Sequence, residues 1–220
     1  MSQDKIEIIR ENYDRVADEY ARRLFSELER KPLDRELLHR FTDAITGRGR
    51  VCDVGCGPGQ VARLLHENGA EVFGLDLSPQ MIEQARALSP DIHFREGNML
   101  GLKLEDGELA GITAFYAIVN IPREFLSTVF CEMHRVLKAD GLLLLAFHIG
   151  DEVLRPEELW GKAISMDFYH LRPEKIQHLL EESGFEIEEV IEREPYAPEV
   201  EYQSRRAYVF ARKAAAPTHP

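Results

Sequence analysis

Short apolar runs alternate with segments of helical period along most of this chain. The apolar runs predict five strands, and the last of them is continuous enough to be buried on both faces of a sheet. Apolar side chains recur every three or four positions between these runs, which predicts helices. The expected strands are 50–54, 71–76, 92–95, 109–117 and 141–147, and the expected helices are 59–68, 79–87 and 122–137. This alternation predicts an α/β fold with a parallel sheet.

Both ends of the chain extend the pattern. Near the N-terminus, apolar and aromatic side chains fall on one face of a helix: Ile9, Tyr13, Val16, Tyr20 and Leu24. In the C-terminal third, residues 174–183 have the helical pattern, beginning after a proline and ending at a glycine. Residues 185–194 and 203–212 then predict two strands joined by a turn that contains two prolines.

A glycine-rich turn joins the first strand to its helix. Glycines occupy positions 55, 57 and 59 in the sequence from Val51 to Gln60. Without Cβ atoms the backbone of such a turn can approach a ligand closely. The following helix would present its N-terminal N–H groups to a carboxylate or phosphate. The turn therefore predicts a site for a nucleotide-type cofactor.

The spacing of the glycines distinguishes this turn from two other cofactor-binding turns, the dinucleotide fingerprint and the P-loop. A dinucleotide fingerprint requires a third glycine at the sixth position, where this chain has Gln60. A P-loop would end in Gly-Lys-Ser/Thr, which this turn lacks. An acid inside the strand, Asp53, belongs to neither pattern. An NAD-dependent oxidoreductase of Rossmann fold is therefore disfavoured, and we retain it as an alternative.

The turn resembles motif I of the class I S-adenosylmethionine-dependent methyltransferases, an acid followed by G-x-G-x-G. Residues 75–82, Leu-Asp-Leu-Ser-Pro-Gln-Met-Ile, are similar to the second motif of that family, and residues 135–141 resemble its R-V-L-K-P-G-G segment. Residues 117–120 resemble the Leu-His-His run of the ubiquinone/menaquinone-methyltransferase-like branch, although Val119 and Asn120 replace both histidines. The resemblance implies a Rossmann-like, doubly wound, seven-stranded sheet. Most strands would be parallel, the C-terminal strand pair antiparallel, and a helical cap would lie at the N-terminus.

The resemblance also implies which residues hold S-adenosyl-L-methionine and its product S-adenosyl-L-homocysteine. The acid and glycines of the turn would form the methionine and ribose side of the pocket. Asp76 would accept the hydrogen bonds of the ribose diol, Leu77 would pack on the adenine, and Asn98 with Met99 would complete the adenine pocket. The full expected set is Tyr20, Asp53, Gly55, Cys56, Gly57, Gly59, Asp76, Leu77, Met81, Asn98, Met99, Ala114 and Phe115.

Two segments outside the alternation should define the acceptor. The first is the N-terminal cap, residues 1–46, ahead of the cofactor-binding core at 47–150. The second, a lid at 151–172, is too apolar for an idle loop. Residues 173–213 should supply the last helix and strands, and 214–220 a disordered tail. Tyr13 and Tyr20 either line the pocket or only pack the cap.

Three residues are candidates for catalysis. His148 directly follows the fifth strand, and ligands of open α/β sheets bind at the carboxyl ends of the strands. A histidine there has a suitable pKa for a general base, or it only orders the loop. His170 in the lid and Tyr20 in the cap are the other candidates. The sequence leaves the nucleophile of the acceptor open among oxygen, nitrogen and carbon, and a non-catalytic cofactor-binding protein remains an alternative.

Composition restricts the partners. The formal net charge of −12 disfavours a nucleic acid, because the chain lacks the field that would concentrate a polyanion. No apolar run is long enough for a membrane span, and the first residues do not resemble a signal peptide. Three cysteines without a second ligand pair favour neither a disulfide framework nor a metal site. We therefore expect a cytoplasmic enzyme without a metal, acting on a small-molecule methyl acceptor, and we leave a homodimer open.

Overall fold

A seven-stranded sheet forms the centre of the computed structural model, which describes residues 1–214. The strand order is β10-β11-β5-β4-β1-β2-β3. β1 to β5 run parallel to one another, and β11 pairs antiparallel with both β5 and β10. The sheet strands are β1 (Val51–Val54), β2 (Val72–Asp76), β3 (His93–Glu96), β4 (Leu109–Phe115), β5 (Leu137–His148), β10 (Phe185–Arg193) and β11 (Arg206–Lys213). This order confirms the expected Rossmann-like sheet with its antiparallel C-terminal pair.

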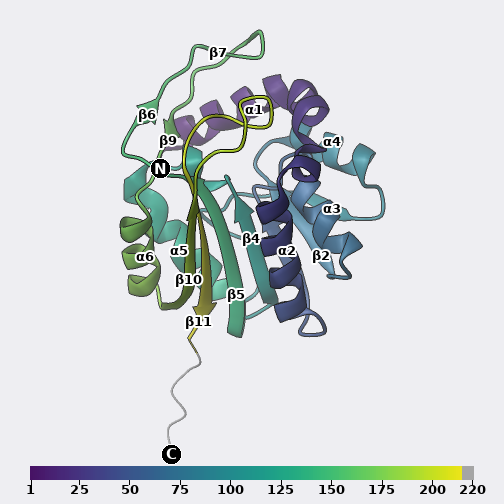
Figure 1. Cartoon of the computed structure of the whole chain (residues 1–220), viewed down its shortest axis with the longest axis vertical. Coiled ribbons are helices and arrows are strands. Elements are labelled where there is room, and N and C mark those ends of the chain that lie inside the picture. Colours follow the sequence, from purple (N-terminus) through teal and green to yellow (C-terminus); the bar gives the residue numbers. More distant parts are fainter. Residues whose placement is uncertain (215–220) are drawn as a thin grey trace, which may run out of the picture.

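Helices cover both faces of the sheet (Figure 1). Along β5, Leu143, Leu145 and Phe147 share one core with α5 (Leu126–Val136) and α6 (Pro173–Glu182). The intervening Leu142, Leu144 and Ala146 share the other core with α2 (Pro32–Ile45), α3 (Gln60–Glu67) and α4 (Pro79–Leu88). Alternate side chains of a strand point to opposite faces, so a strand covered on both sides must be apolar throughout.

The remaining segments gather at the carboxyl edge of the parallel strands. α1 (Gln3–Leu24) crosses this end of the molecule in Figure 1, beside the segment with two small hairpins, to which Arg15 donates a hydrogen bond at Ala163. The hairpins pair β6 (Val153–Leu154) with β9 (Phe168–Tyr169), and β7 (Glu158–Leu159) with β8 (Lys162–Ala163). Short 3₁₀ turns complete the edge: η1 (Glu27–Arg30), η2 (Ile118–Asn120) and η3 (Arg123–Phe125).

Most predicted elements begin and end within a few residues of the observed ones, and two differences are informative. The pattern did not single out α2, which packs on the sheet through Leu38 and Phe41. β5 also starts earlier than expected, directly after α5, with Asp140 at φ 58° where the family pattern has glycine. The division into cap, core and lid stays a prediction, and the expected tail lies outside the described residues except for Ala214. No helix among residues 1–214 has both the length and the apolar character that a bilayer crossing requires.

Candidate cofactor and active site

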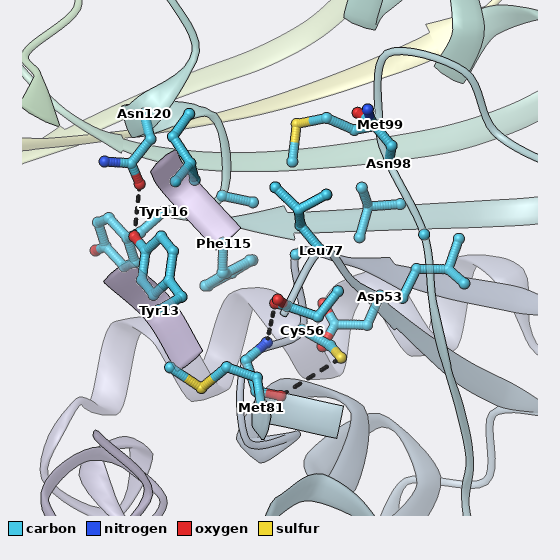
Figure 2. A pocket seen from close by; sticks show the side chains of 18 of the residues that line it. Tyr13, Asp53, Cys56, Leu77, Met81, Asn98, Met99, Phe115, Tyr116 and Asn120 are labelled. Atoms are coloured by element: carbon cyan, nitrogen blue, oxygen red, sulfur yellow. Dashed lines mark hydrogen bonds between the residues drawn. The ribbon is translucent and has the colours of Figure 1, made fainter. Parts of the chain in front are cut away.

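A pocket opens at the carboxyl ends of β1, β2 and β4, under α1 (Figure 2). It encloses about 930 Å³ of space with its open mouth included. Eleven of the thirteen predicted cofactor residues line it: Tyr20, Asp53, Gly55, Cys56, Gly57, Asp76, Leu77, Met81, Asn98, Met99 and Phe115. The other two, Gly59 and Ala114, are absent from its wall.

The three glycines of the turn have left-handed backbone conformations and different surroundings. At Gly57 (φ 52°) a Cβ would meet only the ring of Tyr20, at 3.8 Å, so the backbone is open to the pocket. At Gly55 (φ 69°) a Cβ would lie 2.5 Å from the Ala117 side chain, so this glycine lets two loops meet. At Gly59 (φ 89°) a Cβ would lie 2.8 Å from Phe94. Gly59 thus packs closely against Phe94 of β3, and its place among the cofactor residues stays a prediction.

Asp53 lies at the pocket, but its carboxylate is engaged by the protein. The Thr113 hydroxyl donates to Oδ1 at 2.8 Å, and the Ala62 N–H donates to Oδ2 at 3.2 Å. The side chain is buried, and burial raises its pKa to about 7. Asp53 therefore ties β1 to β4 and to the first turn of α3, which holds the glycine turn in place.

Asp76 ends β2 and also orders the glycine turn. The Gly57 N–H donates to Oδ2 and the Ser78 N–H to Oδ1, both at 2.8 Å. Burial raises the pKa of this carboxyl to about 6, even though these N–H groups favour the charged form. Each oxygen keeps a further lone pair that can accept a hydrogen bond from a ligand.

α1 closes one side of the pocket. The Tyr13 hydroxyl donates to Asn120 Oδ1 at 2.5 Å (Figure 2), and the Asn120 amide donates to the carbonyl of Asp167 in the hairpin segment at 2.7 Å. Two turns further along α1, Tyr20 packs edge-on against Trp160, with ring centroids 5.6 Å apart. The cap, the end of β4 and the hairpins therefore meet around the same opening.

Gln60 brings a polar group without a partner to the wall. Its Nε2 donates to Glu27 Oε1 at 3.2 Å, while its buried Oε1 has no hydrogen-bond partner among the described residues. A buried carbonyl oxygen of this kind is costly unless a ligand supplies a donor. It therefore fits a site for a ligand that carries N–H or O–H groups.

The two predicted catalytic histidines lie together but outside the pocket wall. Their rings stack at 5.5 Å, and the Tyr116 ring, 4.9 Å from His148, separates them from the pocket. His148 Nδ1 is 2.7 Å from Ser204 Oγ. Burial and nearby Arg206 lower the pKa of His148 to about 3. A general-base function for either histidine stays a prediction that this geometry does not support.

The wall also contains residues that the sequence reasoning did not assign to the cofactor. They are Met1, Ile9, Tyr13, Gln60, Tyr116, Ala117, Asn120 and Ile121, among others. The sequence leaves Tyr13 either in the pocket or in the packing of the cap, and in the sequence Gln60 indicates only a departure from the dinucleotide fingerprint. Met1 and Ile9 reach the wall with the N-terminal segment and α1, and the residues from Tyr116 to Ile121 through the chain reversal after β4, where Tyr116 has φ 53°.

The fold and the pocket together define a Rossmann-like cofactor-binding protein with its site at the carboxyl edge of the sheet. Residues 51–141 match a family model described as "Methyltransferase domain". This part of the chain is therefore similar to methyltransferase domains.

Two relatives and one solved structure illustrate the similarity. A malonyl-[acyl-carrier protein] O-methyltransferase of Enterobacter lignolyticus is 29% identical over 131 residues, which cover 57% of this chain and 51% of the relative. A demethylmenaquinone methyltransferase of Chlorobaculum tepidum is 32% identical over 124 residues, which cover 56% and 47%. The chain thus spans about half the length of these relatives. A methyltransferase structure from Methanosarcina mazei matches with a TM-score of 0.69 at 18% identity, over 76% of this chain and 93% of the other.

Proposed function

We propose that this protein is a methyltransferase that moves a methyl group from S-adenosyl-L-methionine to a small organic acceptor. The observation that carries the proposal is the pairing of the open Gly57 backbone with the Asp76 carboxylate in one pocket of a methyltransferase domain. The two relatives are named for different acceptors, so the proposal names only the class of acceptor.

The residues of the pocket fit this cofactor. Asp76 would accept the ribose hydroxyls on its free lone pairs. The unpartnered Oε1 of Gln60 and the open backbone at Gly57 would receive the polar methionine end, and Leu77, Asn98 and Met99 would enclose the adenine. When bound, the cofactor supplies an activated methyl group, so the protein has mainly to align the acceptor and exclude water.

The segments around the mouth would perform that alignment. Tyr13, Asn120 and Trp160 connect α1, the end of β4 and the hairpins, and these elements would close over the acceptor. We place the enzyme in the cytoplasm because its cysteines, Cys52, Cys56 and Cys131, are all free thiols, as a reducing compartment requires. The homodimer considered above stays a prediction.

Mass spectrometry of reaction products tests the proposal. The protein is incubated with isotope-labelled S-adenosyl-L-methionine and a small-molecule extract of cells, and labelled products are compared with those of Asp76→Ala. We expect labelled methyl groups in a small molecule, strongly reduced with the variant. Cofactor binding without any labelled product would favour a non-catalytic cofactor-binding protein. Binding of NAD in place of S-adenosyl-L-methionine would favour an oxidoreductase.

A further inference from the structure

Six titratable side chains line the pocket. Within residues 1–214 they come from α1, β1, the glycine turn, β2 and the end of β4: Tyr13, Tyr20, Asp53, Cys56, Asp76 and Tyr116. Catalysis by proton removal would need one of these groups as a general base within hydrogen-bond reach of the acceptor.

The two carboxylates have other tasks. Both oxygens of Asp53 accept hydrogen bonds from Thr113 and Ala62, inside the domain. Asp76 holds Gly57 and Ser78, and its remaining lone pairs face the proposed ribose. Asp53 is therefore engaged within the domain and Asp76 is assigned to the ribose, so neither carboxylate is assigned to the acceptor.

The remaining groups are acids that keep their protons. Burial raises the pKa of Tyr13, Tyr20, Tyr116 and the Cys56 thiol above their ordinary values. Tyr13 already donates to Asn120. The Tyr20 hydroxyl makes no hydrogen bond to another residue of the described chain, so it is an O–H donor open to a ligand. The nearest imidazole, that of His148, lies behind the Tyr116 ring.

A pocket whose side chains supply donors and no free base suits an acceptor that arrives already ionised. Phenols and alkylamines, with pKa values of about 10, must lose a proton near neutral pH before they can attack, whereas a carboxylic acid with a pKa of about 4 has already done so. We propose, on the basis of the function proposed above, that the acceptor is a small carboxylic acid and the product its methyl ester.

The step balances without a proton transfer. A carboxylate oxygen forms the new bond to the methyl carbon while the carbon–sulfur bond breaks, and its electron pair stays on sulfur. The negative acceptor and the positive sulfonium become a neutral ester and a neutral thioether. The two opposite charges are neutralised in this step, so a pocket with apolar walls does not oppose it. The Tyr20 hydroxyl would donate to the acceptor carboxylate and orient it.

The stability of the product bond tests the proposal. The protein is incubated with methyl-labelled cofactor and a panel of benzoate, phenylacetate, octanoate and a cell extract, beside matched phenols and amines. We expect label that mild base releases as methanol, as methyl esters do. Base-stable label in a phenol or amine would overturn the acceptor class and leave the methyltransferase intact. Bound cofactor with no methyl ester formed from any acid would overturn it too, whereas failure to bind the cofactor would overturn the proposed function itself.

Binding supplies a readout separate from turnover. With S-adenosyl-L-homocysteine bound, calorimetry should show that the best acid of the panel binds at least tenfold more tightly than its methyl ester. Tyr20→Phe should weaken that acid about ten- to a hundredfold, as expected for a hydrogen bond to a charged group. Tyr202→Phe, at a tyrosine that is 59% exposed and outside the pocket wall, is the matched control. Equal binding of acid and ester would contradict the proposal.

The pH profile distinguishes an ionised acceptor from one that needs a base. At saturating cofactor and acceptor, kcat should change less than about threefold between pH 7 and 9.5, because the acid is ionised throughout. A protein with an N-terminal tag, which moves the α-amino group of Met1 away from the wall, should give the same profile. A tenfold rise per pH unit over this range would contradict the proposal.

Discussion

Asp53 and Asp76 show how two acids at the ends of neighbouring strands acquire different tasks. Both are buried at the same pocket, and burial raises the pKa of each. Both oxygens of Asp53 accept hydrogen bonds from Thr113 and Ala62, which belong to β4 and α3. Asp76 accepts only backbone N–H groups of the turns beside it, so its carboxylate remains available at the pocket.

Asp76→Asn should weaken S-adenosyl-L-methionine binding by about ten- to a hundredfold, because a neutral amide replaces a charged acceptor of the ribose diol. Calorimetry measures the dissociation constant. Glu96→Gln at the end of β3, an exposed acid outside the pocket wall, is the matched control and should bind as the wild type does. Unchanged binding by the Asp76 variant would refute the ribose assignment.

Cofactor binding should weaken as the pH falls below about 6. The pKa of Asp76 is raised to about 6, so below that pH the carboxyl is protonated and must release its proton before it can accept both hydroxyls. Linkage then predicts a loss of affinity that approaches about tenfold per pH unit. Titrations at pH 5 to 8 measure it, and Asp76→Asn should remove the component centred near pH 6. An equal pH dependence in the variant would assign the proton to another group.

The glycines predict two separable defects. Gly59→Ala should lower the free energy of unfolding by roughly 1–3 kcal/mol, since its Cβ would collide with Phe94 in a left-handed conformation. Gly57→Ala should destabilise less and reduce cofactor affinity more, because its Cβ would enter the open pocket. Urea unfolding and calorimetry on both variants compare the two quantities. The reverse ranking would contradict the positions assigned to them.

The local sequence predicts those pocket residues whose type is required by the conformation of their own turn or strand end. The glycines, Asp53 and Asp76 are recognisable because a turn of this shape restricts which residues can occupy each position. Tyr116 and Asn120 gave no such signal, since the chain reversal after β4 brings them to the wall. The sequence also does not show which side chains are buried. His148 is near the expected strand end, yet the Tyr116 ring packs against it.

At the scale of elements, α1 is held over the pocket by polar contacts at several points. Tyr13 contacts Asn120 after β4, while Asp14 Oδ1 accepts hydrogen bonds from the Ser78 hydroxyl at 2.6 Å and from the Gln80 N–H at 3.2 Å, at the start of α4. The helical period predicted α1, but only the structure shows what it covers. α2 was missed as a sheet-packing helix because nothing in its apolar pattern distinguishes a cap from a core helix.

A double-mutant cycle measures the attachment of α1. Tyr13→Phe and Asn120→Ala should each destabilise the protein, and their coupling should be about 0.5–1.5 kcal/mol, the value of one partly buried hydrogen bond. Urea unfolding supplies the free energies. Tyr202→Phe with Asn120→Ala, a pair that shares no hydrogen-bond partner and in which Tyr202 is 59% exposed, is the control cycle and should be additive. Additivity in the Tyr13 cycle as well would show that the contact does not hold the helix.

At the scale of the whole molecule, a buried ionic cluster joins the loop between β10 and β11 to the rest of the fold. Glu201 accepts hydrogen bonds from Arg193 at 2.5 Å and lies 3.2 Å from Arg206 Nε, while Arg193 reaches Asp34 of α2 at 3.1 Å. These four side chains are almost fully enclosed. Such a cluster is costly to break from one side, because the partners remain charged without compensation.

Glu201→Gln should therefore lower the free energy of unfolding by about 3–5 kcal/mol. Glu67→Gln, which removes the exposed pair of Arg63 and Glu67, should cost less than about 1 kcal/mol. Denaturant unfolding of both variants measures the difference. Equal effects would show that the cluster is solvated in solution.

The binding of S-adenosyl-L-methionine is the most direct test of the central claim. In calorimetric titrations of the purified protein at pH 7.5, S-adenosyl-L-methionine and S-adenosyl-L-homocysteine should each bind at one site per chain. Asp76→Asn should weaken both, and NAD should not bind at the same concentrations. Saturable binding of NAD, with no heat from S-adenosyl-L-methionine, would contradict the account.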